Sequence, residues 1–105
     1  MNITRHTGAA GEVRLALAGE LDLATVDRLH QHVKQEIIAD PPPRRLVIDL
    51  TGVTFCDSTG LGALLKAQAV ATENGTTFLV INPSGMTRRL MQATGLHDVL
   101  TSAPS

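Results

Sequence analysis

Aromatic residues are almost absent from this sequence, which contains two Phe and neither Tyr nor Trp. The hydrophobic core must therefore be built from Leu, Val, Ile and Ala. The shortage also removes the aromatic platforms on which single-stranded nucleic acids stack. Nine Lys and Arg residues stand against ten Asp and Glu, so the net charge is only −1 and no basic surface is predicted. We therefore expect no nucleic-acid partner.

Cysteine occurs once, as Cys56, so an internal disulfide is impossible and a small buried hydrophobe is expected there. No run approaches the roughly 20 apolar residues of a membrane span. Residues 1–7 lack the apolar core of a signal peptide, so we expect a cytoplasmic protein with no membrane partner.

His30 and His32 stand two apart on a predicted helix and point in different directions, so no metal site and no cofactor are predicted.

The composition is that of an ordinary globular domain, 43% hydrophobic and 18% charged. Its 105 residues predict a single domain over residues 1–105. Alternating or continuous apolar residues predict strands over residues 2–6, 13–18, 45–50 and 77–81. Apolar residues at helical spacing predict helices over residues 23–39, 58–73 and 84–93. This order (β-β-α-β-α-β-α) predicts an α/β fold, a small mixed sheet covered by helices, with parallel crossovers after an opening hairpin.

Several details of these elements are also predicted. Gly19 is expected to end the second strand, and Asp22 to cap the helix that follows. A loop is expected over residues 51–57, with Val53 and Phe55 as its buried anchors.

Further side-chain roles are predicted on either side of that loop and near the chain end. Asp49 is placed to hold the loop by hydrogen bonds. Met86 and Met91 are expected to reach the core and Val99 to pack back onto it, whereas residues 101–105 are expected to fray.

The segment from Asp57 to Gly62, with the sequence Asp-Ser-Thr-Gly-Leu-Gly, lies between a buried strand and an apolar helix. Strand ends in α/β folds are where ligands and partners dock. Ser58 at the helix start lies near free N–H groups and the positive end of the helix dipole. Gly60 and Gly62 leave room for another molecule to approach the backbone. The alternative is that Ser58 or Asp57 is only an N-cap and that the glycines allow tight packing of the helix on the sheet.

Known enzyme motifs do not fit this segment. A nucleophile elbow requires Gly-x-Ser-x-Gly, and Cys56 stands at the first Gly position. An aspartic-protease loop requires Gly where Thr59 stands, and the Gly-Lys-Ser/Thr of a P-loop is absent. We therefore predict that the protein is not an enzyme.

Residues 47–62, with the sequence VIDLTGVTFCDSTGLG, closely resemble the signature of STAS domains, and more narrowly of bacterial anti-sigma factor antagonists. Gly19-Glu20-Leu21-Asp22, followed by Thr25, resembles the strand-to-helix turn of that family. Arg89-Leu90 with Thr94-Gly95-Leu96 resembles its final helix and stop. The resemblance covers nearly the whole chain in the right order.

The resemblance implies a partner switch. In that family the unmodified antagonist binds an anti-sigma factor that is also a serine kinase, and so releases the sigma factor. The kinase phosphorylates the serine that matches Ser58, which ends binding, and a phosphatase restores the unmodified form. Thr59 stands where the family often has a second Ser and is a second candidate for phosphorylation. The implied partner-binding residues are Asp22, Asp57, Ser58, Thr59, Gly60 and Leu61.

A second hypothesis is a scaffold STAS domain that assembles a larger signalling complex without a phosphorylation switch.

Overall fold

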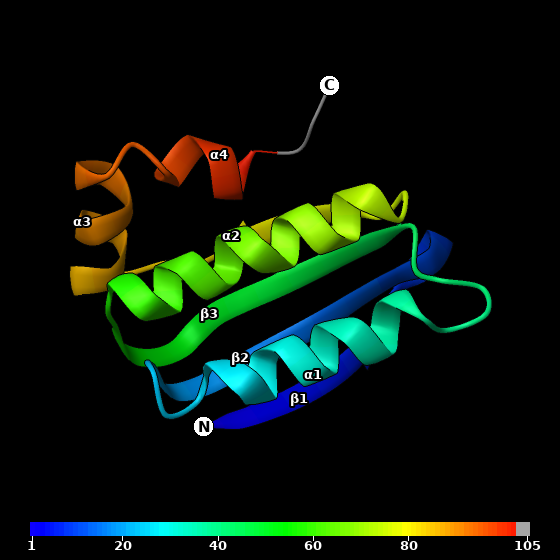
Figure 1. Cartoon of the computed structure of the whole chain (residues 1–105), viewed down its shortest axis with the longest axis horizontal. Helices are drawn as coiled ribbons and strands as arrows, with labels where there is room; N and C mark the ends of the chain where they lie inside the picture. Colours follow the sequence, from blue (N-terminus) through cyan, green and yellow to red (C-terminus); the bar gives the residue numbers. More distant parts are fainter. Residues whose placement is uncertain (103–105) are drawn as a thin grey trace.

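A computed structural model of the chain describes residues 1–102, which form one sheet and the helices packed on it (Figure 1). The strands are β1 (Asn2–Thr7), β2 (Glu12–Leu21), β3 (Arg45–Cys56) and β4 (Thr77–Ile81). The helices are α1 (Val26–Ile37), α2 (Ser58–Glu73), α3 (Gly85–Ala93) and α4 (His97–Thr101), and a short 3-10 turn, Ala9–Gly11, joins β1 to β2. α1 and α2 lie side by side across one face of the sheet, α4 packs against β4 and α2, and α3 packs against β3 and α4 (Figure 1). The predicted fold class is confirmed.

The sheet has the order β1-β2-β3-β4. β1 and β2 form the predicted antiparallel hairpin, whereas β2–β3 and β3–β4 are parallel. Leu15, Ile48 and Val80 lie in register across the three parallel strands, and each is fully buried. Because these strands run in the same direction, their carboxyl ends meet at one edge of the sheet. The loops that follow them are therefore brought together.

The core is aliphatic, as the composition predicts. The pleat directs alternate residues of β2, β3 and β4 toward the helices, and those side chains are nearly all buried. Short side chains on the facing side of α2 let this helix lie close to its neighbours; they are Ala63, Ala67 and Ala71. Each large aliphatic side chain buried in this way contributes about 1.5–3 kcal/mol to stability.

Two strands run further than the sequence predicted. β2 continues through Gly19, which adopts φ +107° within an irregular stretch of the β2–β3 pairing and does not end the strand. β3 continues to Cys56, so the loop predicted over residues 51–57 is wrong for residues 51–56. Gly52 pairs with Ala18 of β2, and a Cβ on Gly52 would lie 2.9 Å from the Cβ of Ala18, so the glycine permits this close approach of the two strands.

Burial corrects three further predictions. Val53 is buried as expected, but Phe55 is 48% exposed. Met91 is buried, whereas Met86 is 71% exposed and Val99 is 49% exposed.

The buried face of α3 explains the error at Met86. Thr87 and Met91, four residues apart, form the buried side of α3, and Met86 lies one residue, about 100° of rotation, away from that side. The sequence did not predict α4, whose Leu100 is fully buried. Fraying was predicted for residues 101–105, of which residues 103–105 lie outside the described residues, and Thr101 still belongs to α4.

α2 and β4 have the predicted bounds, but α1 begins at Val26, three residues later than predicted. The Asp22 carbonyl accepts the N–H groups of Thr25 and Val26, and its carboxylate accepts the N–H of Ala24 at 3.0 Å. Asp22 therefore holds a turn before the helix, and Thr25 occupies the N-cap position. Local side-chain bonds of this kind compete with helical ones, which explains the late start.

Candidate functional site

Asp57 organises the segment between β3 and α2. Its Oδ1 accepts the N–H of Gly60 at 2.9 Å, which makes Asp57 the N-cap of α2. Its own N–H points to the carbonyl of Leu21 at the end of β2, 3.4 Å away. The segment is thus tied both to its own helix and to the neighbouring strand. Of the two residues proposed as a cap, the structure assigns the role to Asp57 and leaves Ser58 free of it.

Ser58 is the first residue of α2, and both Ser58 and Thr59 are exposed. The first N–H groups of a helix have no partners within the helix and carry partial positive charge. An anionic group on the Ser58 hydroxyl would therefore sit at the favourable end of the α2 dipole.

The two glycines of the segment have different surroundings. A Cβ on Gly60 would overlap the carbonyl oxygen of Leu21 and lie 2.9 Å from the Cys56 Sγ, so Gly60 permits close packing of α2 on the sheet. Gly62 is exposed, and a Cβ there would have no atom within 4 Å. Packing therefore explains Gly60, whereas Gly62 leaves an open approach to the backbone. Leu61 is 3% exposed and belongs to the core.

Cys56 lies beneath the segment. It is 6% exposed, and burial, together with the nearby charge of Asp57, raises the pKa of its thiol to about 11. The thiol is thus protonated at neutral pH. This agrees with the predicted small buried hydrophobe and not with a reactive thiolate.

The loop after β2 lies next to this segment. The Thr25 hydroxyl donates to the Glu20 carbonyl at 2.8 Å and accepts the N–H of Asp22 at 3.0 Å. Because Asp57 N–H reaches the same strand end at Leu21, the structure brings the loops of Asp22 and Asp57 together.

A family profile described as "Mlab, STAS domain" matches residues 5–101. The chain belongs to the STAS domain family. This confirms the resemblance found in residues 47–62.

Relatives of this STAS domain include anti-sigma factor antagonists. It is 33% identical to the anti-sigma-F factor antagonist RsfB of Mycobacterium tuberculosis, over 96% of this chain and 86% of that protein. An anti-sigma factor antagonist from Mycobacterium paratuberculosis, whose crystal structure is known, has 30% sequence identity to this chain. The two structures superpose with a TM-score of 0.69, over 96% of this chain and 84% of the mycobacterial one. The Bacillus cell fate determinant SpoIIAA in its phosphorylated form shares the fold, with 20% identity and a TM-score of 0.73 over 99% and 92% of the two chains.

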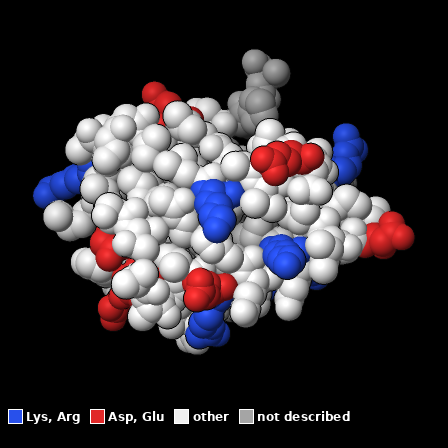
Figure 2. Space-filling model, viewed as in Figure 1, with Lys and Arg blue, Asp and Glu red and all other residues white. Residues whose placement is uncertain are grey.

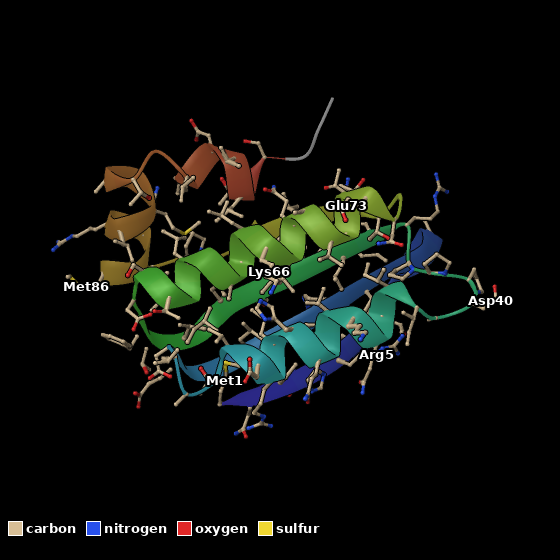
Figure 3. All side chains as sticks on the ribbon, viewed as in Figure 1. Met1, Arg5, Asp40, Lys66, Glu73 and Met86 are labelled. Carbon is tan, nitrogen blue, oxygen red and sulfur yellow. The ribbon has the colours of Figure 1, made fainter. Side chains whose placement is uncertain are left out.

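Three large apolar side chains of this STAS domain are exposed near the carboxyl ends of the parallel strands. Leu23, in the loop after β2, is 77% exposed; Phe55, near the end of β3, is 48% exposed; and Met86, in the first turn of α3, is 71% exposed. We call these three residues the strand-end apolar set. Figure 3 shows Met86 at the end of the molecule where α2 begins. Sequence reasoning missed the set, because it assigned Phe55 and Met86 to the core and Leu23 to the start of the first helix.

Asp49 lies further back on β3. Burial alone would raise its pKa, but hydrogen bonds from Thr51 and Asn82 and the charge of Arg14 hold the pKa of its carboxyl below the ordinary value. Its Oδ1 accepts the N–H and the hydroxyl of Thr51, at 2.9 and 2.6 Å, and the side-chain amide of Asn82 at 3.1 Å. Asp49 thus fixes the start of the segment that was predicted as a loop and joins it to the turn after β4, rather than contacting Ser58.

Residues 1–102 contain neither a candidate metal site nor a candidate membrane span. No group of three or more His, Cys, Asp or Glu side chains is placed there to hold a metal ion. None of the helices in the same range is both long and apolar enough to cross a membrane.

Proposed function

We propose that this STAS domain is a non-enzymatic, cytoplasmic anti-sigma factor antagonist. In this proposal it binds an anti-sigma factor through the end of the molecule that carries Ser58 and the strand-end apolar set. One observation carries the proposal: an exposed serine hydroxyl at the start of α2 shares the strand-end edge with large exposed apolar side chains. Clusters of this kind on a soluble domain are typical of protein interfaces. The names of the mycobacterial relatives support the choice of partner.

We further propose that the anti-sigma factor is a serine kinase that inactivates its antagonist. The Ser58 Oγ attacks the γ-phosphorus of ATP, the bond from that phosphorus to the β-phosphate oxygen breaks to release ADP, and a base of the kinase takes the hydroxyl proton. The product carries about −1.5 to −2 additional charge at neutral pH. A serine phosphatase hydrolyses the phosphate ester with water and restores the binding form.

The charge distribution explains why the phosphate would end binding without unfolding the domain. The free N–H groups at the start of α2 can donate hydrogen bonds to the phosphate oxygens within the domain. In a complex the same charge would be buried beside Asp57 and among apolar side chains, where desolvation and like-charge repulsion oppose it. We therefore expect Ser58→Asp to unfold at the same denaturant concentration as the unchanged protein and to lose binding to the anti-sigma factor. Gross unfolding of Ser58→Asp would contradict this mechanism.

The proposal is tested by incubating the pure protein with ATP and each candidate anti-sigma kinase from its host, followed by mass spectrometry. One phosphate on Ser58 is expected, absent from Ser58→Ala and retained in Thr59→Val. Loss of the phosphate in Thr59→Val but not in Ser58→Ala would move the modification to Thr59. If no kinase modifies the protein, the scaffold hypothesis gains support, and sedimentation with candidate signalling complexes becomes the decisive measurement.

A further inference from the structure

A groove runs between α1 and α2 on the face of the molecule away from the sheet. Its volume is about 440 Å³, within the range of small-molecule sites. Three basic side chains, His30, Lys34 and Lys66, line it together with the apolar side chains Val33, Ile37 and Val70. We call this the α1–α2 groove. Figure 3 shows Lys66 on the side of α2 that faces α1.

The charge of the α1–α2 groove is unusual for this protein. Lys34 and Lys66 are the only two lysines in a chain whose net charge is −1, and both line this one groove. His30 and Lys34 are four residues apart and share a helix face. No Asp or Glu is among the residues of the described chain that line the groove. Figure 2 shows basic side chains near the middle of the α1–α2 face, with uncharged surface between them and acidic side chains around them.

One side chain that lines the groove has a polar atom without a partner. The Nε2 of His30 is buried without a hydrogen bond to any of the described residues. A buried nitrogen left in this way costs about 1–3 kcal/mol, which an incoming hydrogen-bonding group would recover.

The apolar part of the groove is elongated. Ala67 contributes only a methyl group to its floor, and Ile38, 70% exposed, stands at its far rim. Residues 30 to 38 span about 12 Å along α1 at 1.5 Å per residue. A volume of about 440 Å³ is large enough for a single aliphatic chain.

We propose that the α1–α2 groove binds a fatty acid. Lys34, Lys66 and His30 hold the carboxylate, since an anion satisfies both ammonium groups and the imidazole together. The acyl chain lies along Val33, Ile37 and Val70 and covers Ile38, so apolar surface on both partners leaves water. This site is separate from the proposed switch, because α2 places Lys66 about 12 Å along its axis from Ser58, and the inference does not depend on the proposed function.

The test is a titration of ¹⁵N-labelled protein with dodecanoate below its critical micelle concentration, followed by amide chemical shifts. Saturable shifts are expected at the groove residues of α1 and α2. Dodecanol, which has the same chain and no charge, is expected to bind at least tenfold more weakly. Absence of saturable shifts, or equal affinity for the two probes, would overturn the proposal.

Variants locate the carboxylate. Lys34→Gln/Lys66→Gln is expected to weaken dodecanoate binding at least tenfold and to leave dodecanol binding unchanged. Arg88→Gln/Arg89→Gln removes the same charge from exposed positions on α3 and should change the affinity less than twofold. Thermal unfolding by circular dichroism confirms that each variant folds. Equal losses of dodecanoate affinity in the two double variants would show that only the net charge of the protein matters. That result would contradict a specific site.

Ile38→Ser tests the far rim, where an exposed side chain can be changed with little risk to the fold. A several-fold loss of dodecanoate affinity is expected, and no loss would contradict the placement of the chain. Sedimentation without ligand provides a separate check. Concentration-dependent association abolished by Ile38→Ser would assign the groove to a second copy of this chain and overturn the proposal.

Discussion

The only two aromatic residues of the chain occupy opposite environments on parallel strands. Phe78, in the body of β4, is 3% exposed and packs in the core, whereas Phe55, near the carboxyl end of β3, is 48% exposed. The body of the sheet lies under α1 and α2, and the carboxyl end of β3 leads directly into the start of α2 (Figure 1). Apolar residues therefore stabilise the fold in the first region and form an exposed surface in the second.

The largest expected effect tests the buried half of this comparison. Phe78→Ala should lower the free energy of unfolding by about 3–5 kcal/mol, because it removes a buried ring and leaves a cavity. Urea unfolding followed by circular dichroism measures the change. A loss below about 1 kcal/mol would show that Phe78 does not belong to the core.

The next largest effect on stability is expected at Gly60, and it contrasts with the effect expected at Gly62. Gly60→Ala should destabilise the domain by about 1–3 kcal/mol or more, because the new methyl group meets Leu21 and Cys56. Gly62→Ala, at an open helical position, should stabilise α2 by up to about 1 kcal/mol. Thermal unfolding of both variants checks the prediction, and equal effects would contradict the different roles of the two positions.

A smaller effect on stability is expected from the ionisation of Asp49, which lies on β3 between the buried body of the sheet and its carboxyl end. The pKa of Asp49 is lower in the folded protein than its ordinary value of 3.8, so its carboxylate stabilises the fold at neutral pH. That contribution should disappear as the pH falls below about 4 and through the lowered pKa. Urea unfolding between pH 7 and pH 2 should show a shallower loss of stability in Asp49→Asn. Asp98→Asn, an exposed change on α4, serves as the matched control.

The smallest effect on stability is expected at the exposed half of the comparison. Phe55→Ala should change the free energy of unfolding by less than about 1 kcal/mol, because half of the ring already faces water. The same variant should weaken binding to the anti-sigma factor at least tenfold if the strand-end apolar set forms the interface. Calorimetric titration with the anti-sigma kinase measures this, with Val99→Ala, exposed on α4, as the control. If Phe55→Ala binds the anti-sigma kinase as tightly as the unchanged protein does, Phe55 is not part of the proposed binding surface.

Local sequence patterns predicted the bounds of an element correctly where its capping, periodicity and stop residues all indicated the same limits. α2 combines a capping Asp57, a regular apolar stripe and the stop at Asn74-Gly75, and its predicted bounds are those observed. β4 is a short apolar run between turn residues, and it too was predicted correctly. Prediction was less reliable where the side chains of Asp22 and Thr25 compete for backbone groups, because several local arrangements satisfy the same donors.

The candidate site was predicted in part. The segment around Ser58 followed from its position between strand and helix and from its resemblance to STAS signatures. The strand-end apolar set did not, because Leu23, Phe55 and Met86 are far apart in the sequence and only the parallel crossovers place all three toward the same end of the sheet.

The sequence alone determined the element order, the aliphatic core and the STAS family, since periodicity and a continuous signature are local properties of the chain. Tertiary structure decided the extension of β3 through Gly52, the exposure of Phe55 and Met86, and the α1–α2 groove. A periodic pattern shows which residues share a face, but only the packed neighbours decide whether that face is covered.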